Sequence, residues 1–161
     1  MKTLITFYSR TGKTKNVAKE ISKIIDTDID EIKDKENRKG IVGWMHAGRD
    51  AYKEVLTDIE YKNNPKNYDL VIIGTPIWAA KMTPAIRTYL KKNKNNFKKI
   101  AFFATSGSND GIKTFSEMES LSKKPITTLI LTNKNFKGKV IKVWEIKKIK
   151  EFCEKIKNGK K

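Results

Sequence analysis

Short apolar runs alternate along the chain with segments whose apolar residues recur every three or four positions. Segments 69–74 and 100–104 are almost continuously apolar, which is typical of strands buried on both faces of a sheet. Shorter runs and alternating patterns predict further strands at 4–8, 27–32, 125–131 and 140–143. The sequence between 33 and 40 is polar and predicts a loop.

The segments between these strands have the spacing of amphipathic helices. Their apolar residues recur at helical intervals over 17–25, 44–59, 85–90, 112–121 and 146–156. Thr83 and Pro84 precede the third of these in the order of an N-cap and a first-turn proline. This alternation predicts an α/β fold, with a parallel sheet between two helical layers. No repeat or linker interrupts it, so we expect residues 1–161 to form a single domain.

Composition limits the chemistry that the chain can perform. Its 161 residues are 38% hydrophobic and 33% charged, which is enough for one domain with its own core. The single cysteine, Cys153, excludes an internal disulfide, and the single histidine, His46, excludes a multi-histidine metal site. No apolar run approaches the roughly 18 residues of a membrane span, and the start of the chain lacks a signal-peptide core. We expect a cytoplasmic protein without membrane insertion.

The chain is strongly basic. It has 35 lysine and arginine residues against 18 aspartate and glutamate residues, a formal net charge of +17. Such a charge attracts acidic partners. Because the basic residues are scattered rather than gathered on one element, we expect no specific binding of nucleic acid.

The loops that follow the strands carry the functional signal, because ligands of open parallel sheets bind beyond the carboxyl ends of the strands. The first of these loops combines three hydroxyl side chains with a glycine: Ser9, Thr11, Gly12 and Thr14. This combination suits a phosphate at a helix N-terminus. Lys13 and Lys15 would oppose the dipole of the following helix, and a bound anion would remove that conflict.

Other phosphate-binding motifs do not fit. A Walker A loop would need glycine where Phe7 stands, and the strand 69–74 is followed by Thr75 rather than by an acidic magnesium ligand. The same threonine argues against a receiver domain, which needs an aspartate there. A glycine-rich dinucleotide fingerprint is absent, and residues 7–14 contain no cysteine for a phosphatase of low molecular weight.

Three motifs at successive strand ends resemble the flavodoxin family. They are Ser9-x-Thr11-Gly12-x-Thr14, Gly74-Thr75-Pro76-Ile77-Trp78 and Ala104-Thr105-Ser106-Gly107-Ser108. Segment 43–51 is also similar to one found in some flavodoxin-like proteins. The resemblance implies a three-layer, doubly wound, five-stranded parallel sheet of order 2-1-3-4-5 that binds FMN.

Carried over by position, the resemblance also implies the FMN contacts. The first loop would bind the phosphate, Trp78 would stack on the isoalloxazine ring, and the third loop would bond the pyrimidine side. The expected FMN-binding residues are Ser9, Arg10, Thr11, Gly12, Lys13, Thr14, Thr75, Pro76, Ile77, Trp78, Ala79, Ala80, Thr105, Ser106, Gly107, Ser108 and Gly111. By its helical spacing, Trp44 is expected in the core or in a lid over the site, His46 on the surface and Cys153 in the core.

The sequence departs from the family pattern in three ways. Ala79 stands where members often have a glycine whose peptide flips when the flavin takes one electron. Positive φ costs roughly 1 kcal/mol more for alanine, so we expect the one-electron reduced flavin to be less stabilised. The third loop carries Asn109 and Asp110 instead of an aromatic residue. Family members are commonly acidic, whereas the charge of +17 predicts redox partners with an acidic surface.

Two functions remain open. The first is a flavodoxin-type electron carrier, in which the flavin performs the chemistry and the protein positions it. The alternative is an FMN-dependent NAD(P)H:quinone oxidoreductase, which needs an open flavin face and a nucleotide site. Because the sequence shows no clear dimer interface, we expect a monomer or a weak dimer.

Overall fold

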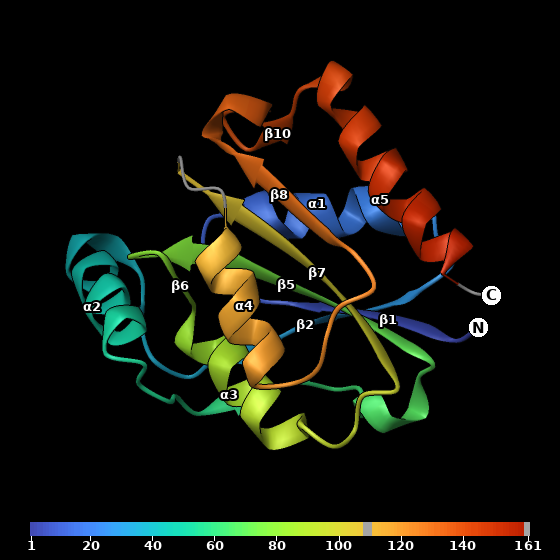
Figure 1. Ribbon diagram of the computed structural model, residues 1–161. Helices are drawn as coiled ribbons and strands as arrows, with labels where there is room; N and C mark the ends of the chain where they lie inside the picture. Colours follow the sequence, from blue (N-terminus) through green and yellow to red (C-terminus); the bar gives the residue numbers. More distant parts are fainter. Residues whose placement is uncertain (108–110, 160–161) are drawn as a thin grey trace.

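A parallel sheet forms the centre of the molecule, whose computed structural model describes residues 1–107 and 111–159. Its strands lie in the order β2-β1-β5-β7-β8 (Figure 1). They are β1 (Thr3–Phe7), β2 (Asp28–Glu31), β5 (Leu70–Trp78), β7 (Lys99–Ser106) and β8 (Thr128–Thr132). Neighbouring strands pair in parallel throughout. Numbered among themselves, these strands have the order 2-1-3-4-5, so the expected fold class is confirmed.

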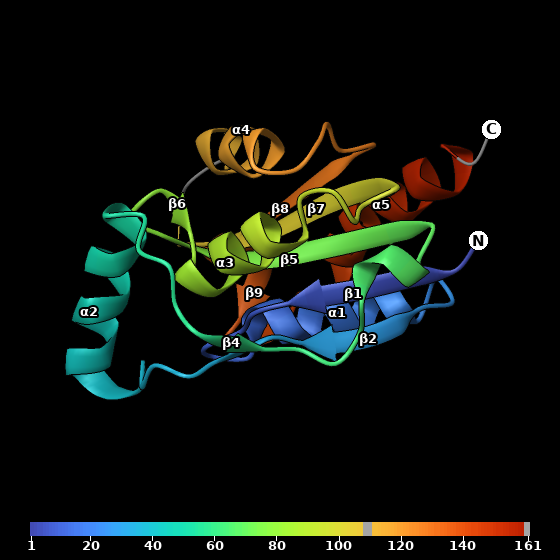
Figure 2. The ribbon, with the colours of Figure 1, turned by 90° about the horizontal axis from the view of Figure 1, so that it is seen from below.

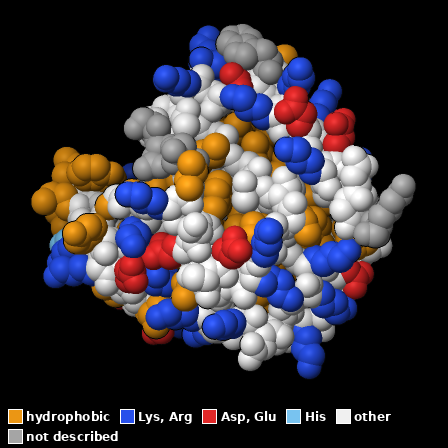
Figure 3. Space-filling model, in the orientation of Figure 1, with side chains coloured by type: hydrophobic (Ala, Val, Ile, Leu, Met, Phe, Trp, Pro, Cys, Tyr) orange, Lys and Arg blue, Asp and Glu red, His pale blue; other side chains and the backbone are white. Residues whose placement is uncertain are grey.

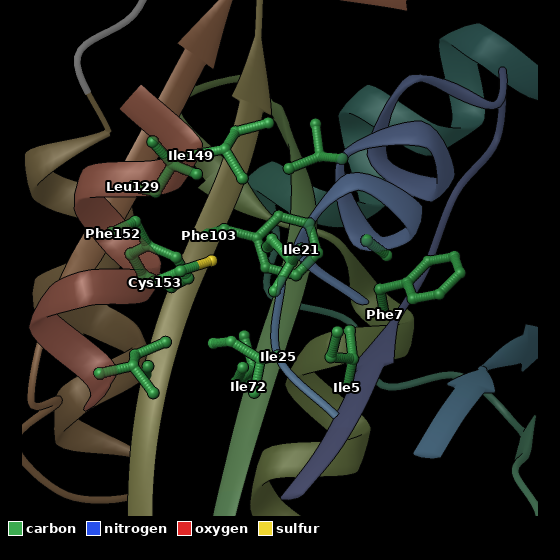
Figure 4. Close-up of a cluster of buried hydrophobic side chains, with 14 of the residues drawn as sticks. Ile5, Phe7, Ile21, Ile25, Ile72, Phe103, Leu129, Ile149, Phe152 and Cys153 are labelled. Carbon is green, nitrogen blue, oxygen red and sulfur yellow. The ribbon is translucent and has the colours of Figure 1, made fainter. Parts of the chain in front are cut away.

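Helices cover both faces of this sheet (Figure 2). One layer consists of α1 (Lys13–Ser22) and α5 (Ile146–Asn158), and the other of α3 (Pro84–Asn93) and α4 (Ile112–Ser120). On the first face, Ile21 and Cys153 pack with Phe103 and Ile72 of the sheet (Figure 4). On the second face, Tyr89 is fully buried in a separate hydrophobic cluster. The strands are apolar on both sides because each side meets a helical layer.

Short strands and turns connect the main elements. Strand β6 (Lys81–Met82) pairs antiparallel with the end of β5, while β3 (Lys33–Asp34) pairs with β4 (Ile59–Glu60) and β9 (Phe136–Lys137) with β10 (Val140–Ile141). Short 3-10 helices are η1 (Pro65–Asn67), η2 (Asn133–Asn135) and η3 (Val143–Glu145). Several expected boundaries therefore shift: the loop at 33–40 contains β3, the strand at 69–74 extends through Trp78, and 140–143 is half of a separate hairpin.

The helix expected over 44–59 is α2 (Gly40–Tyr52), and its expected apolar stripe is not a core face. Glu54 has a φ of 57°, a left-handed conformation that ends the helical path, and Ile59 lies in β4. The large apolar residues of the stripe are exposed, namely Trp44, Tyr52, Val55 and Leu56. The spacing of the apolar residues correctly predicted a helix. The prediction that its large apolar residues face the core was wrong.

Candidate functional site

A cleft of about 260 Å³ opens beyond the carboxyl ends of the strands, beside β1 and β5, where the strand order reverses. Its walls come from four strand ends and from α2. The lining residues are Arg10, Thr11, Lys13, Thr14, Trp44, Pro76, Ile77, Trp78, Thr105, Ser106, Gly107 and Asn133. Among residues 1–107 and 111–159, no aspartate, glutamate, histidine or cysteine lines the cleft.

The loop after β1 is folded around the Ser9 hydroxyl. The backbone N–H groups of Gly12 and Lys15 donate to Ser9 Oγ over 3.1 and 3.2 Å. Gly12 precedes α1 with a φ of 95°, in the left-handed region that glycine adopts at little cost. The N-cap residue Gly12 has no side chain that could accept a hydrogen bond from α1, and the first turn contains no acidic residue, so Ser9 satisfies only part of the helix terminus. The N-terminus of α1 is therefore suited to an anionic ligand.

Cations surround this helix terminus. Lys13 Nζ donates to Asn133 Oδ1 over 2.7 Å, and Lys15 Nζ forms an ion pair with Glu31 over 2.6 Å. Arg10 lines the cleft, and its Nε is buried without a hydrogen-bond partner. Since Arg10 lines the cleft, its guanidinium group could pair with an anion bound there.

Trp78 forms an aromatic wall at the end of β5. Its ring meets that of Tyr8 edge-on, with centroids 5.6 Å apart and planes at 88°. Burial, helped by the nearby Asp34 carboxylate, raises the pKa of Tyr8 to about 12, so its phenol stays protonated at neutral pH. The contact fixes the Trp78 ring at the mouth of the cleft.

The turn after Trp78 is held in a left-handed conformation. Ala79 and Ala80 have φ values of 48° and 60° between the paired residues Trp78 and Lys81. Two residues with positive φ form a type I′ turn, whose twist suits a tight hairpin. We expected positive φ to be unfavourable for Ala79, yet this residue already has positive φ in the structure. The argument that Ala79 makes the one-electron reduced flavin less stable therefore no longer holds.

Contacts with the neighbouring helix α4 hold this turn. Thr114 Oγ1 donates to the carbonyl of Ala80 over 3.2 Å, and Lys81 Nζ lies 3.3 Å from the Glu117 carboxylate. Glu117 also receives a 2.6 Å hydrogen bond from the buried Arg87 guanidinium. Hydrogen bonds and charge therefore offset the backbone strain of the turn.

The loop after β7 forms the third side of the cleft. Thr105 and Thr14 share a 2.8 Å hydrogen bond between their buried hydroxyls, which joins this loop to α1. Gly107 is exposed at the rim, and its carbonyl accepts a 3.3 Å hydrogen bond from the N–H of Asn133. Ser108 lies outside the described residues, as do Asn109 and Asp110.

The chain's sequence matches a known family over most of its length. Residues 2–144 match the family model described as Flavodoxin. The chain belongs to the flavodoxin family. No curated protein matches this flavodoxin-family chain.

Solved structures agree with this membership. A flavoprotein from Lactobacillus acidophilus, solved in complex with FMN, is 28% identical and has a TM-score of 0.70, with 80% of this chain and 92% of that chain covered. Its apo form is 27% identical, with a TM-score of 0.62 and coverages of 83% and 93%. Oxidised flavodoxin 2 from Bacillus cereus is 16% identical with a TM-score of 0.60, and 99% of each chain is covered, which shows the shared fold.

Most of the residues expected from the flavodoxin resemblance converge on the cleft. Those that line it are Arg10, Thr11, Lys13, Thr14, Pro76, Ile77, Trp78, Thr105, Ser106 and Gly107. The others lie behind it or at its edge. Ser9 and Gly12 shape the first loop, the Thr75 hydroxyl donates to the carbonyl of Pro76, and Ala79 and Ala80 form the exposed turn. Their contact with FMN stays a prediction.

Gly111 does not line the cleft. It is buried at the start of α4 with a φ of 76°. A Cβ there would lie 3.2 Å from Ile130 Cδ1 and 3.3 Å from the Phe115 ring. Conformation and close packing therefore account for this glycine.

Asn133 was not predicted from the sequence as a residue of the site, and the position of Trp44 was left open. Asn133 follows directly after β8, so the rule that ligands lie beyond strand ends could have found it. Trp44 is 59% exposed, which excludes the core position, and it lines the cleft, which agrees with the alternative of a lid over the site. The sequence left the two positions open, because the choice depends on how α2 packs.

Residues outside the cleft show little sign of catalytic chemistry. His46 is exposed on α2, as expected. Cys153 is buried, and burial raises the pKa of its thiol to about 11, which makes it unreactive. Within 1–107 and 111–159, no group of three or more potential ligands could hold a metal ion. Over the same residues, no helix has the length and apolar character needed to cross a membrane.

Proposed function

We propose that this chain binds FMN in the cleft and acts as an electron carrier. The observation that carries the proposal is the pairing of a helix N-terminus that has no acidic residue in its first turn with an aromatic wall at the point where the strand order reverses. The flavoprotein from Lactobacillus acidophilus, which shares the fold, was solved with FMN. FMN would supply one-electron chemistry when bound.

The residues present fit the two ends of FMN. The backbone N–H groups of Thr11, Lys13 and Thr14 and the side chain of Arg10 would hold the phosphate, because Ser9 already accepts from Gly12 and Lys15 and the first turn of α1 has no acidic residue. Trp78 offers a flat apolar face to the ring system. Thr105 and Ser106 line the same cleft from the end of β7.

The lining favours a carrier over an enzyme that moves protons. General acid–base catalysis uses a titratable side chain within hydrogen-bond reach of substrate. The described lining has no carboxylate, imidazole or thiol. Electron transfer needs only the position and electrostatic environment of the cofactor.

Anaerobic reduction separates the carrier from the NAD(P)H:quinone oxidoreductase. We expect the FMN-loaded protein to stay oxidised with NADH and with NADPH, and to be reduced by dithionite, as followed by flavin absorbance. Rapid bleaching by either nicotinamide would contradict the carrier and support the oxidoreductase. Failure to take up FMN would contradict both.

A further inference from the structure

Helix α2 presents its large apolar side chains to solvent. Its buried positions are the small residues Gly43, Ala47 and Ala51. We call the opposite side the α2 face, made up of Ile41, Val42, Trp44, Met45 and Tyr52, which are 81%, 66%, 59%, 62% and 71% exposed. An ordinary surface helix is arranged the other way round, with its large apolar residues toward the core. Figure 3 shows the resulting hydrophobic patch at the left of the molecule.

The α2 face is not needed to hold the helix in place. The small residues Ala47 and Ala51 of the helix are almost fully buried, and Gly43 leaves room for the backbone of Arg38, which leads into the helix. The buried Arg38 guanidinium forms ion pairs with Asp34 over 2.6 Å and with Asp50 over 2.8 Å. These contacts anchor α2, which leaves the apolar side chains free for a partner.

The α2 face adjoins the proposed FMN site. Trp44 belongs to the α2 face and also lines the cleft. A molecule that covers this face would therefore lie at the mouth of the cleft, where electrons would pass to or from the bound cofactor. The exposed apolar area is on the order of several hundred Å², the scale of the small interfaces of transient electron-transfer complexes.

The charges around the α2 face are mainly positive. Lys39, Arg49 and Lys53 are exposed along the helix and at its ends. Asp50 is already engaged by Arg38 and Arg49. A second copy would bring the same cations together on chains that each carry +17, whereas an acidic protein would be attracted.

We propose that the α2 face docks an acidic redox protein. This rests on the proposed function, because the docked protein exchanges electrons with the cofactor in the cleft. One electron leaves the reduced donor, which is thereby oxidised, and the same electron reduces the oxidised cofactor. Apolar contact gives the complex its affinity, and the surrounding cations speed the encounter and set its orientation.

Binding of a strongly acidic [2Fe–2S] ferredoxin to the FMN-loaded protein tests the proposal. The double variant Ile41→Ser, Met45→Ser removes apolar surface from one side of α2 without touching the cleft lining. Val140→Ser, Val143→Ser is a matched control, since these side chains are 66% and 79% exposed near β10, away from α2 (Figure 1). Calorimetric titration at low salt gives the affinity, and stopped-flow absorbance gives the rate of electron transfer from reduced ferredoxin.

We expect the α2 variant to weaken ferredoxin binding about tenfold and the control to change it less than twofold. Added NaCl should weaken binding by both the wild-type protein and the control. Equal binding by the wild type and the α2 variant would overturn the proposal. So would no ferredoxin binding by the wild type, a wild-type dimer that the variant dissociates, or vesicles of phosphatidylglycerol that bind through the α2 face while ferredoxin does not.

The cofactor provides an internal check. The α2 variant should retain full FMN content and an unchanged rate of reduction by dithionite. A wild-type chain that binds no FMN would refute the proposed function. If the wild-type protein binds FMN but does not bind ferredoxin, only the docking proposal is refuted.

Discussion

At the scale of single residues, the shape of the cleft depends on a few side chains with distinct structural roles. Ser9 accepts the hydrogen bonds that close the first loop, and the paired hydroxyls of Thr14 and Thr105 join that loop to the third. Trp78 is held by an edge-to-face contact with Tyr8 and lines the cleft. Each of these residues can be changed without removing a core element.

Replacement of Trp78 tests the aromatic wall. Trp78→Ala should weaken FMN binding roughly thirtyfold, because stacking on an aromatic ring contributes about 2 kcal/mol. Quenching of flavin fluorescence measures the affinity. Trp78→Phe keeps an aromatic face and should lose much less. Equal affinity of the wild type and Trp78→Ala would show that the ring binds elsewhere.

At the scale of elements, the hairpin after β5 stores backbone strain. Left-handed φ costs about 1–2 kcal/mol for a non-glycine residue, and Ala79 and Ala80 both adopt it. Ala80→Gly should stabilise the protein by about 0.5 kcal/mol, since relief of strain exceeds the added entropy of the unfolded glycine. Urea unfolding measures the change. A lower unfolding midpoint for this variant would argue against a strained turn.

The anchor of α2 should depend on pH. Burial tends to raise the pKa of Asp50, but hydrogen bonds from Arg38 and Arg49 outweigh it and hold the pKa below its usual value. A lowered pKa means that the stabilisation is complete above the unfolded value of about 3.9 and is lost as the pH falls through the folded value. Asp50→Asn should therefore cost about 1–2 kcal/mol at pH 7 and progressively less in acid.

Urea unfolding of the wild type and of Asp50→Asn at pH 7 and pH 3 checks this expectation. Glu151→Gln is a suitable control, because its carboxylate is 55% exposed and its ion pair spans 3.9 Å. A difference between wild type and Asp50→Asn that stays constant with pH would contradict the anchoring role.

The elements also show what sequence alone can predict. The sequence predicted the continuously apolar strands at 69–74 and 100–104 and the loops at the strand ends. It could do so because strands that are buried on both faces have a recognisable run of apolar residues. The sequence did not predict that the large apolar residues of α2 face solvent. The apolar residues of this helix have the spacing of a core stripe, but the small residues Gly43, Ala47 and Ala51 face the protein and the large ones face solvent. The hairpin turn was also hidden, because nothing local marks two alanines for positive φ.

At the scale of the whole molecule, the charge of +17 is the dominant feature. Self-repulsion of like charges destabilises the compact state, and salt screens it. An increase from 0.05 to 0.5 M NaCl should therefore raise the melting temperature by roughly 3–5 °C. Thermal unfolding followed by circular dichroism measures this shift. A melting temperature that falls with salt would mean that attractive ion pairs outweigh the net repulsion.

The central claim is that the N-terminus of α1 holds the phosphate of FMN beside Trp78. Titration of the apo protein with FMN and, separately, with riboflavin tests it most directly, because the two ligands differ only in the phosphate. We expect FMN to bind one to one with a Kd below about 1 µM, and riboflavin to bind at least about tenfold more weakly. Equal affinity for the two ligands, or no saturable binding of FMN, would contradict the account.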